Sequence, residues 1–529
     1  MKFAINKLSC SLPFVIGLLL GLYFVVFNVI GFDFAYFPGD LGDARFNNYI
    51  LEHSFRYFTG QEASFWNAPF MHPENNIVSY SDNLVGTAPI YSIFRFIGYD
   101  TVTSFQFWVL AIFMLNYACC YFFLKWSFKS VYPAVLGAFI FAFSLALQSQ
   151  MTHAQMFPRF FIPLALWMCL LFMKELKPIY FFATLFMVVL QFYAGIYLGF
   201  MLVIPIGCML LVILFGYKRK LFYTQIKKAK WVILIIGSFI INISIAAVLM
   251  VPYYYHSKET GINYYESIVD SIPTVRSFFY TTPGSLFWDG LSKTGEDYPA
   301  FWDHQIFPGL ISIICAITVV LGVFFRKKLS VLRNAFSDNT AILFIVGAVT
   351  FLLFVRYQGY SLYWFVHHLP GFGSMRSLTR IINVELIFFA VAVSFVAHLM
   401  IKRYANFSIA IFLIFMSLLV ADNYMNEGAS YRTKKSISLQ RVSALKEKMK
   451  SIPQGSIVSY EPINKTMPAY VYQLDAMLAT QDLGLKSVNG YSATAPFNYH
   501  FYWDEMNESS RLIWFDTKAF DPDTLYVIN

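Results

Sequence analysis

The chain has 529 residues, of which 58% are hydrophobic and only 13% are charged. Soluble globular domains carry about 25% charged residues, so this composition excludes an ordinary soluble protein and indicates a polytopic membrane protein. The net charge of +9 would also suit a nucleic-acid-binding protein. However, the basic residues gather in short loops between apolar segments, which is typical of cytoplasmic loops and argues against a nucleic-acid partner.

Apolar stretches of about 20 residues recur along the chain, and each is long enough to cross a bilayer as a helix. Lys2 and Lys7 place the N-terminus in the cytoplasm, and the first span is expected to stay uncleaved because no signal-peptide cleavage pattern follows it. Eleven spans are predicted, over residues 11–32, 105–125, 131–148, 160–173, 178–196, 198–216, 231–252, 306–325, 340–356, 381–401 and 405–421.

This order of spans puts the basic loops 217–230 and 326–333 inside and three long loops outside, over residues 33–104, 253–305 and 357–380. Residues 422–529 are more polar and contain alternating apolar segments, which predict a small α/β domain outside the cytoplasm. The expected fold is therefore mostly α: a multi-pass domain over residues 1–421 in the plasma (inner) membrane, followed by an extracytoplasmic α/β domain over residues 422–529.

The first outer loop begins with the sequence PGDLGDAR over residues 38–45, which brings two carboxylates to the membrane surface. Asp43 or Asp40 could act as a general base, and two close carboxylates could also hold a divalent cation. The other interpretation is that Asp-Gly turns merely cap the preceding helix. Residues 46–58 follow with Phe46 and Ile50 on one helical face and polar residues on the other, which predicts a helix lying in the membrane interface.

Arginines in the outer loops run against the usual distribution of positive charge. Arg159 lies close to His153, and Arg376 and Arg380 are four residues apart, which would put both guanidiniums on one face of a helix. Arginine suits phosphate, so Arg376, Arg380, Arg159 and His153 are candidate ligands of a donor phosphate. Snorkelling of the arginines to lipid headgroups is the alternative.

Three further residues are candidates for binding an acceptor or a sugar. Arg45 and Asp82 lie in the first outer loop, and Glu385 lies within a predicted span. A carboxylate inside a membrane marks a functional site by default, although an internal salt bridge would explain Glu385 equally well.

The layout resembles the GT-C superfamily of membrane glycosyltransferases, and most nearly its bacterial YfhO-like or mannosyltransferase-like members. The residues that carry the resemblance are Gly39, Asp40, Asp43 and Arg45 in the first loop, the segment PGFGSMRSLTR over residues 370–380, and Asn489, Gly490, Tyr491, Ser492 and Pro496 in the tail.

The resemblance implies transfer of a hexose or pentose from a polyprenyl-phosphate sugar to a glycan, lipid or protein acceptor outside the cytoplasm. It also implies that a first-loop aspartate is the catalytic base, which assigns Asp43, with Asp40 as the alternate. The chain lacks the Asp-x-Asp or Asp-x-Glu pair of many members, so metal use stays open.

Two other classes of protein are compatible with the composition. A lipid or glycan transporter or flippase would show internal repeats and charges at the membrane midplane, and the sequence shows no repeat. A non-catalytic envelope-assembly protein is the other alternative.

Overall fold

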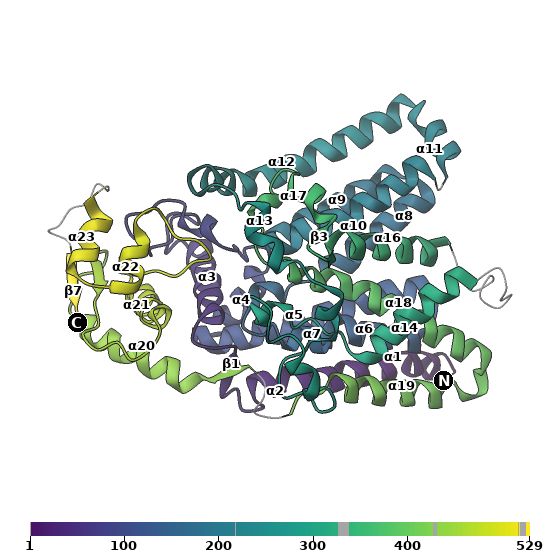
Figure 1. Ribbon diagram of the computed structural model, residues 1–529, viewed down its shortest axis with the longest axis horizontal. Helices are drawn as coiled ribbons and strands as arrows, with labels where there is room; N and C mark the ends of the chain where they lie inside the picture. The colour runs from purple at the N-terminus through teal and green to yellow at the C-terminus, as the bar shows by residue number, and fades with distance from the viewer. Residues whose placement is uncertain (1, 217, 326–337, 427–430, 517, 519–524) are drawn as a thin grey trace.

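The structure is a computed structural model that describes residues 2–216, 218–325, 338–426, 431–516, 518 and 525–529. The predicted basic loop over residues 326–333 lies outside the described residues. A bundle of long helices forms one part of the molecule, and the C-terminal region lies at one end of it (Figure 1).

Eight of the described helices are long and apolar enough to cross a membrane: Leu12–Ile30, Thr101–Phe128, Val131–Gln148, Ala154–Glu175, Ile196–Leu214, Ala229–Thr260, Leu378–Arg403 and Ala405–Asn423. They confirm a polytopic, mostly helical membrane protein. The other three predicted spans fall on shorter apolar helices, namely α9 (Pro178–Ala194), α14 (Leu310–Phe325) and α16 (Asp338–Phe354). The count of eleven spans stays a prediction.

Besides α9, α14 and α16, the bundle contains the following helices, which include the segments of the eight long spans: α1 (Lys2–Gly21), α2 (Phe27–Ile30), α5 (Thr101–Phe128), α6 (Val131–Phe143), α7 (Leu145–Gln148), α8 (Phe161–Glu175), α10 (Ile196–Phe215), α11 (Arg219–Ile226), α12 (Ala229–Thr260), α18 (Ile382–Arg403) and α19 (Ser408–Asn423). α6 packs against both α5 and α18. It has no charged residue, and its side chains from Pro133 onward are buried, as expected for a helix that is hydrophobic on all sides.

The first long loop forms α3 (Asp43–Phe58) and α4 (Ala88–Ile97), and the loops further along form α13 (Tyr265–Ile268), α17 (Tyr363–His367) and a hairpin of β2 (Arg356–Tyr357) and β3 (Tyr360–Ser361). The C-terminal region contains α20 (Lys435–Met449), α21 (Ala469–Leu483), α22 (Tyr499–Glu505) and α23 (Glu508–Asp516). Its parallel sheet has the order β6 (Lys486–Ser487), β5 (Ile457–Tyr460), β7 (Leu525–Ile528).

The first loop and the C-terminal region are joined by backbone pairing. β1 (Tyr36–Pro38) runs antiparallel to β4 (Arg432–Lys434), with Tyr36 opposite Lys434. α3 also packs against α21. The C-terminal region therefore covers the start of the first loop.

The helix predicted over residues 46–58 is present as part of α3, but its polar face does not meet water, as the interfacial interpretation expected. The apolar face of α3 is buried, but so are its polar residues Asn48 and Glu52. Glu52 accepts hydrogen bonds from Tyr91 and Arg95 and thereby ties α3 to α4. The helix is amphipathic because its polar face meets polar partners inside the protein, which periodicity alone does not distinguish from a lipid-water boundary.

Candidate functional site

The predicted base, Asp43, is the first residue of α3, where the partial positive charge of the helix N-terminus favours a carboxylate. Its Oδ2 lies 2.6 Å from Nδ1 of His153, in the segment between α7 and α8. Its Oδ1 accepts a hydrogen bond from the hydroxyl of Tyr491. Three distant segments of the chain therefore meet at this carboxylate.

The surroundings of Asp43 favour its charged form. Burial by itself raises the pKa of Asp43, but the hydrogen bond and charge of His153, the hydrogen bond from Tyr491 and the charge of Arg380 together lower it to about 2. The carboxylate is therefore ionised at neutral pH. Burial, together with the negative charge of Asp43, raises the pKa of the Tyr491 phenol far above its usual range.

A glycine allows the first loop to approach His153. Gly39 has φ +76°, and a Cβ atom placed on it would lie 2.8 Å from the Cα of Thr152. This close contact brings residues 39–43 against the segment that carries His153. The side chain of Asn47 links the same two segments, because its Nδ2 donates to Oε1 of Gln155 at 2.8 Å.

Asp82 is the second acid of the site and is 8% exposed. Its Oδ1 accepts the backbone N–H of Ile196 at 2.6 Å, at the N-terminus of α10. Burial raises the pKa of Asp82 to about 6, although that backbone hydrogen bond and the charge of Arg380 lower it. The charge of Arg380 thus acts on both Asp43 and Asp82, and their carboxyl groups have very different acidities.

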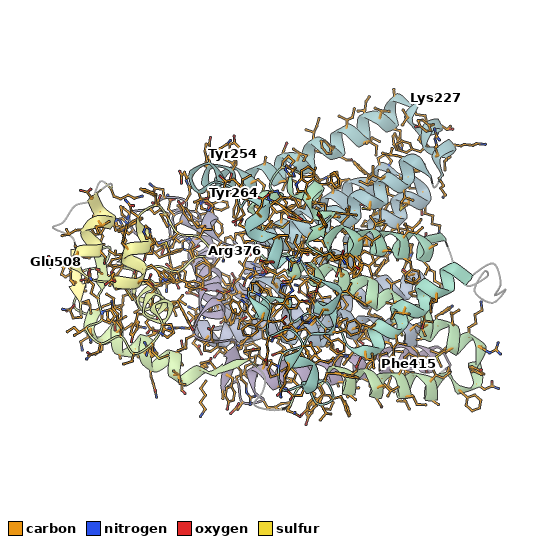
Figure 2. All side chains as sticks on the ribbon, viewed as in Figure 1. Lys227, Tyr254, Tyr264, Arg376, Phe415 and Glu508 are labelled. Atoms are coloured by element: carbon orange, nitrogen blue, oxygen red, sulfur yellow. The ribbon has the colours of Figure 1, made fainter. Side chains whose placement is uncertain are left out.

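The two predicted phosphate-binding arginines, Arg376 and Arg380, lie near this cluster and differ in their contacts and in their exposure. The guanidinium of Arg380 lies 5.0 Å above the centre of the Tyr197 ring, and its buried Nε atom has no hydrogen-bond partner among the described residues. Arg376 is exposed, and Figure 2 shows it at the boundary between the C-terminal region and the bundle. Its positive charge acts on Tyr491.

The prediction that Arg376 and Arg380 share one helical face is wrong. Ser377, between them, has an extended backbone, and regular helix α18 begins only at Ile382. The hydroxyl of Tyr197 accepts the backbone N–H groups of Arg376 and Ser377, at 2.8 and 3.2 Å. These bonds hold the segment in a non-helical form, which a four-residue spacing cannot indicate.

Two predicted site residues have structural partners instead. Arg45 is 3% exposed, and its Nη2 lies 2.6 Å from Oδ1 of Asp475 in α21, so it is buried in an ion pair and is not available to a sugar. Arg159 is 1% exposed, and its guanidinium lies over the ring of Phe141 at 5.1 Å. Arg159 is therefore enclosed by the bundle, which corrects its prediction as a phosphate ligand at the surface.

Glu385 and Asp40 complete the set of predicted residues. Glu385 is buried in α18, and its Oε2 has no hydrogen-bond partner among the described residues. The alternative interpretation of Glu385, an internal salt bridge, therefore finds no support among these residues. Asp40 is exposed at the edge of the site, with Oδ1 accepting the backbone N–H of Gly42 and Oδ2 accepting the hydroxyl of Tyr470. It braces the loop that presents Asp43.

Asp40 and Asp43 as placed do not form a cation site. All four of their carboxylate oxygens accept hydrogen bonds from protein groups. Throughout the described part of the chain, no three His, Cys, Asp or Glu side chains gather closely enough to hold a metal ion.

Tyr491, Tyr197 and Tyr470 contribute to the site without having been assigned a role from the sequence. Tyr491 stands in the tail segment that carries the resemblance, but the sequence contains no signal that it contacts Asp43, 448 positions away. All three act through a hydroxyl group, and tyrosine is abundant in this chain, with 35 residues.

The helical bundle, with its first-loop helix and its C-terminal region over the site, shares its overall fold with a solved oligosaccharyltransferase. Among solved structures, the chain is similar to the oligosaccharyltransferase of Archaeoglobus fulgidus in its apo form, with a TM-score of 0.51 and 12% sequence identity over 97% of this chain and 69% of that chain. The archaeal oligosaccharyltransferase AglB of the same organism, in complex with an inhibitory peptide and a dolichol-phosphate, aligns with a TM-score of 0.47 and 13% identity, over 97% of this chain and 68% of that one.

At this level of identity, the likeness to the apo enzyme concerns the fold alone. No protein-family model matches the sequence, and a search of curated proteins found no match.

Proposed function

We propose that the protein is a membrane glycosyltransferase that transfers a sugar from a polyprenyl-phosphate donor to a glycan, lipid or protein acceptor outside the cytoplasm. The observation that carries this proposal is the ionised Asp43, held by His153 and Tyr491 and stabilised by the charge of Arg380. A base near a cation suits glycosyl transfer from a phosphate leaving group, because the base can take the acceptor proton and the cation can stabilise the phosphate. The fold shared with an oligosaccharyltransferase supports the same class of reaction.

In the proposed reaction, the acceptor hydroxyl attacks the anomeric carbon of the donor sugar. The bond between that carbon and the phosphate oxygen breaks, and the phosphate leaves with the electron pair. Arg380 and the exposed Arg376 compensate the negative charge of the phosphate. The proton of the acceptor hydroxyl passes to the coupled pair of Asp43 and His153. Asp82, whose pKa is about 6, orients a sugar hydroxyl.

The proposal includes the orientation and division of the chain. With the N-terminus in the cytoplasm of a bacterium and eleven spans, residues 422–529 form an extracytoplasmic domain over the membrane domain of residues 1–421. The basic residues at the ends of α5, α8 and α18 support this orientation, since positive charge accumulates on the cytoplasmic side. Within the superfamily, the YfhO-like or mannosyltransferase-like members are the proposed relatives.

The test is transfer of radiolabelled sugar in membranes supplied with a panel of polyprenyl-phosphate sugars and an extract containing the native acceptors. We expect incorporation with the natural chain and a loss of at least a hundredfold with Asp43→Asn, since general-base catalysis contributes about 10²–10⁴-fold. Asp33→Asn is the matched control, because Asp33 is an exposed acid of the same loop that accepts the backbone N–H of the nearby Ala35. Equal incorporation with Asp43→Asn would refute the role of Asp43, and no incorporation by the natural chain would favour the transporter or assembly class.

A further inference from the structure

An apolar cavity of 410 Å³ lies between α12 and the bundle, and its lining comes from α8, α9, α10, α11 and α12. Every side chain that lines it is hydrophobic, including Leu210, Phe222, Ile226 and Trp231. Figure 1 shows α11 at the end of the molecule opposite the C-terminal region, and Figure 2 shows Lys227 there. This cavity is therefore remote from Asp43.

The cavity is open to the surroundings, because its lining residue Ile226 is 41% exposed. Its wholly apolar lining disfavours ordered water and suits an apolar group. Its volume lies in the range of ligand pockets, about 300–1,000 Å³. The outward side chains of α12 next to it, such as Ile233 and Ile236, are exposed and apolar, so this side of the helix faces lipid. The apolar group available to the cavity is therefore a lipid acyl chain.

Helix α11, which lines the cavity on one face, presents positive charge on a neighbouring face. Phe222 and Ile226, four residues apart on α11, line the apolar cavity. Arg219, Tyr223 and Lys227, also at intervals of four, line a second hollow of 460 Å³ together with Lys220 and Thr224. None of the residues lining this second hollow is acidic. An apolar slot and a cationic hollow therefore share one short helix.

We propose that these two hollows together bind one anionic phospholipid of the surrounding bilayer. Its acyl chain occupies the cavity between α10 and α12, and its phosphate lies against Arg219, Lys220 and Lys227. Trp231 holds the start of α12 in place beside the cavity, because its Nε1 donates to the backbone carbonyl of Leu176 at 2.7 Å. The bound lipid thus joins α12 to the bundle. This inference does not depend on the proposed transfer reaction.

The test is native mass spectrometry of the purified full chain in detergent, after equilibration with phosphatidylglycerol, with phosphatidylcholine, or with phosphatidylglycerol and a polyprenyl phosphate together. We expect the natural chain to retain one phosphatidylglycerol and no phosphatidylcholine. The variant Arg219→Gln/Lys220→Gln/Lys227→Gln changes only α11 and the residue after it, so the bundle should fold. Its affinity for phosphatidylglycerol should fall on the order of a hundredfold, since each basic group near an anionic lipid contributes about fivefold.

Two further variants separate the acyl slot from general surface charge. Ile226→Trp narrows the cavity and leaves the three cations in place, and we expect it to weaken retention. Lys129→Gln/Lys402→Gln/Arg403→Gln removes three exposed charges from the ends of α5 and α18, and it should retain the lipid as the natural chain does. Equal retention by the α11 charge variant, or of phosphatidylcholine, would overturn the proposal, as would preferential retention of a polyprenyl phosphate over phosphatidylglycerol.

Discussion

The hydroxyl of Tyr491 donates a hydrogen bond to Oδ1 of Asp43, so a residue of the C-terminal region completes the surroundings of an acid at the first loop. The other carboxylate oxygen of Asp43 is held by His153 at 2.6 Å. The C-terminal region thus contributes directly to the candidate site. Substitutions that loosen the attachment of the C-terminal region to the first loop should therefore change the surroundings of Asp43 and also lower the stability of the protein.

The pKa of Asp43 predicts a specific sensitivity to acid. Its carboxyl has a pKa lowered from 3.8 to about 2, so the charged group stabilises the fold above about pH 4, and this stability is lost as the pH falls toward 2. The contribution is about 2 kcal/mol. Thermal unfolding in detergent should show Asp43→Asn less stable than the natural chain at pH 6, with a difference that shrinks at pH 3. A difference that does not change with pH would contradict this account.

Asp82 should behave in the opposite sense. Burial raises its pKa from 3.8 to about 6, so its charged form destabilises the fold, and the penalty develops as the pH rises from about 4 to above 6. Asp82→Asn keeps an oxygen for the backbone N–H of Ile196 and removes the charge. We expect it to stabilise the protein at pH 8 by up to about 3 kcal/mol and to have little effect at pH 4. Unfolding of Asp82→Asn at a lower temperature than the natural chain at pH 8 would argue against this.

Two glycines allow a matched test of the contact between the first loop and the His153 segment. Gly39 and Gly60 have φ values of +76° and +75°, but only Gly39 has a neighbour that a Cβ atom would strike. Gly60→Ala should cost about 1–2 kcal/mol from the left-handed backbone alone. Gly39→Ala should cost more, and it should reduce sugar transfer because the loop moves away from Thr152. Similar losses in both variants would show that the close approach is unimportant.

The ion pairs of Asp475 should attach the C-terminal region to α3. Asp475 is buried and lies 2.6 Å from Arg45 and 2.7 Å from Arg441. Asp475→Asn leaves Arg45 buried without its anionic partner, so we expect a loss of about 3–5 kcal/mol in the free energy of unfolding.

Limited proteolysis should detect release of the C-terminal region in Asp475→Asn, and sugar transfer should fall with it because Tyr491 moves away from Asp43. The exposed pair of Asp297 with Arg276 is the control, and Asp297→Asn should leave proteolysis and transfer unchanged. Normal proteolysis of Asp475→Asn would contradict the proposed attachment.

Much of the membrane character was readable from the sequence, because a membrane imposes local requirements. A span needs about 20 consecutive apolar residues whatever the rest of the chain does, and all eight long apolar helices correspond to predicted spans. Asp43 could also be singled out locally, as one of two acids in the PGDLGDAR segment at the start of the first outer loop. The prediction of its role still awaits the transfer experiment.

The surroundings of each candidate were decided by tertiary packing. Arg45 and Arg159 looked like accessible cations in the sequence, yet one is paired with Asp475 and the other is enclosed against Phe141. The sequence of α3 predicted a surface helix because it has one apolar and one polar face. Amphipathic periodicity identifies these two faces but does not show which groups cover them.

The sequence by itself therefore determined that this is a polytopic membrane protein and that acids and arginines lie near the ends of its spans. Only the tertiary structure decided that Asp43, His153, Asp82, Arg380 and Tyr491 form one cluster. The physical reason is that hydrophobic length and charge bias act over neighbouring residues, whereas the contact between Asp43 and Tyr491 depends on how the whole bundle and the C-terminal region pack.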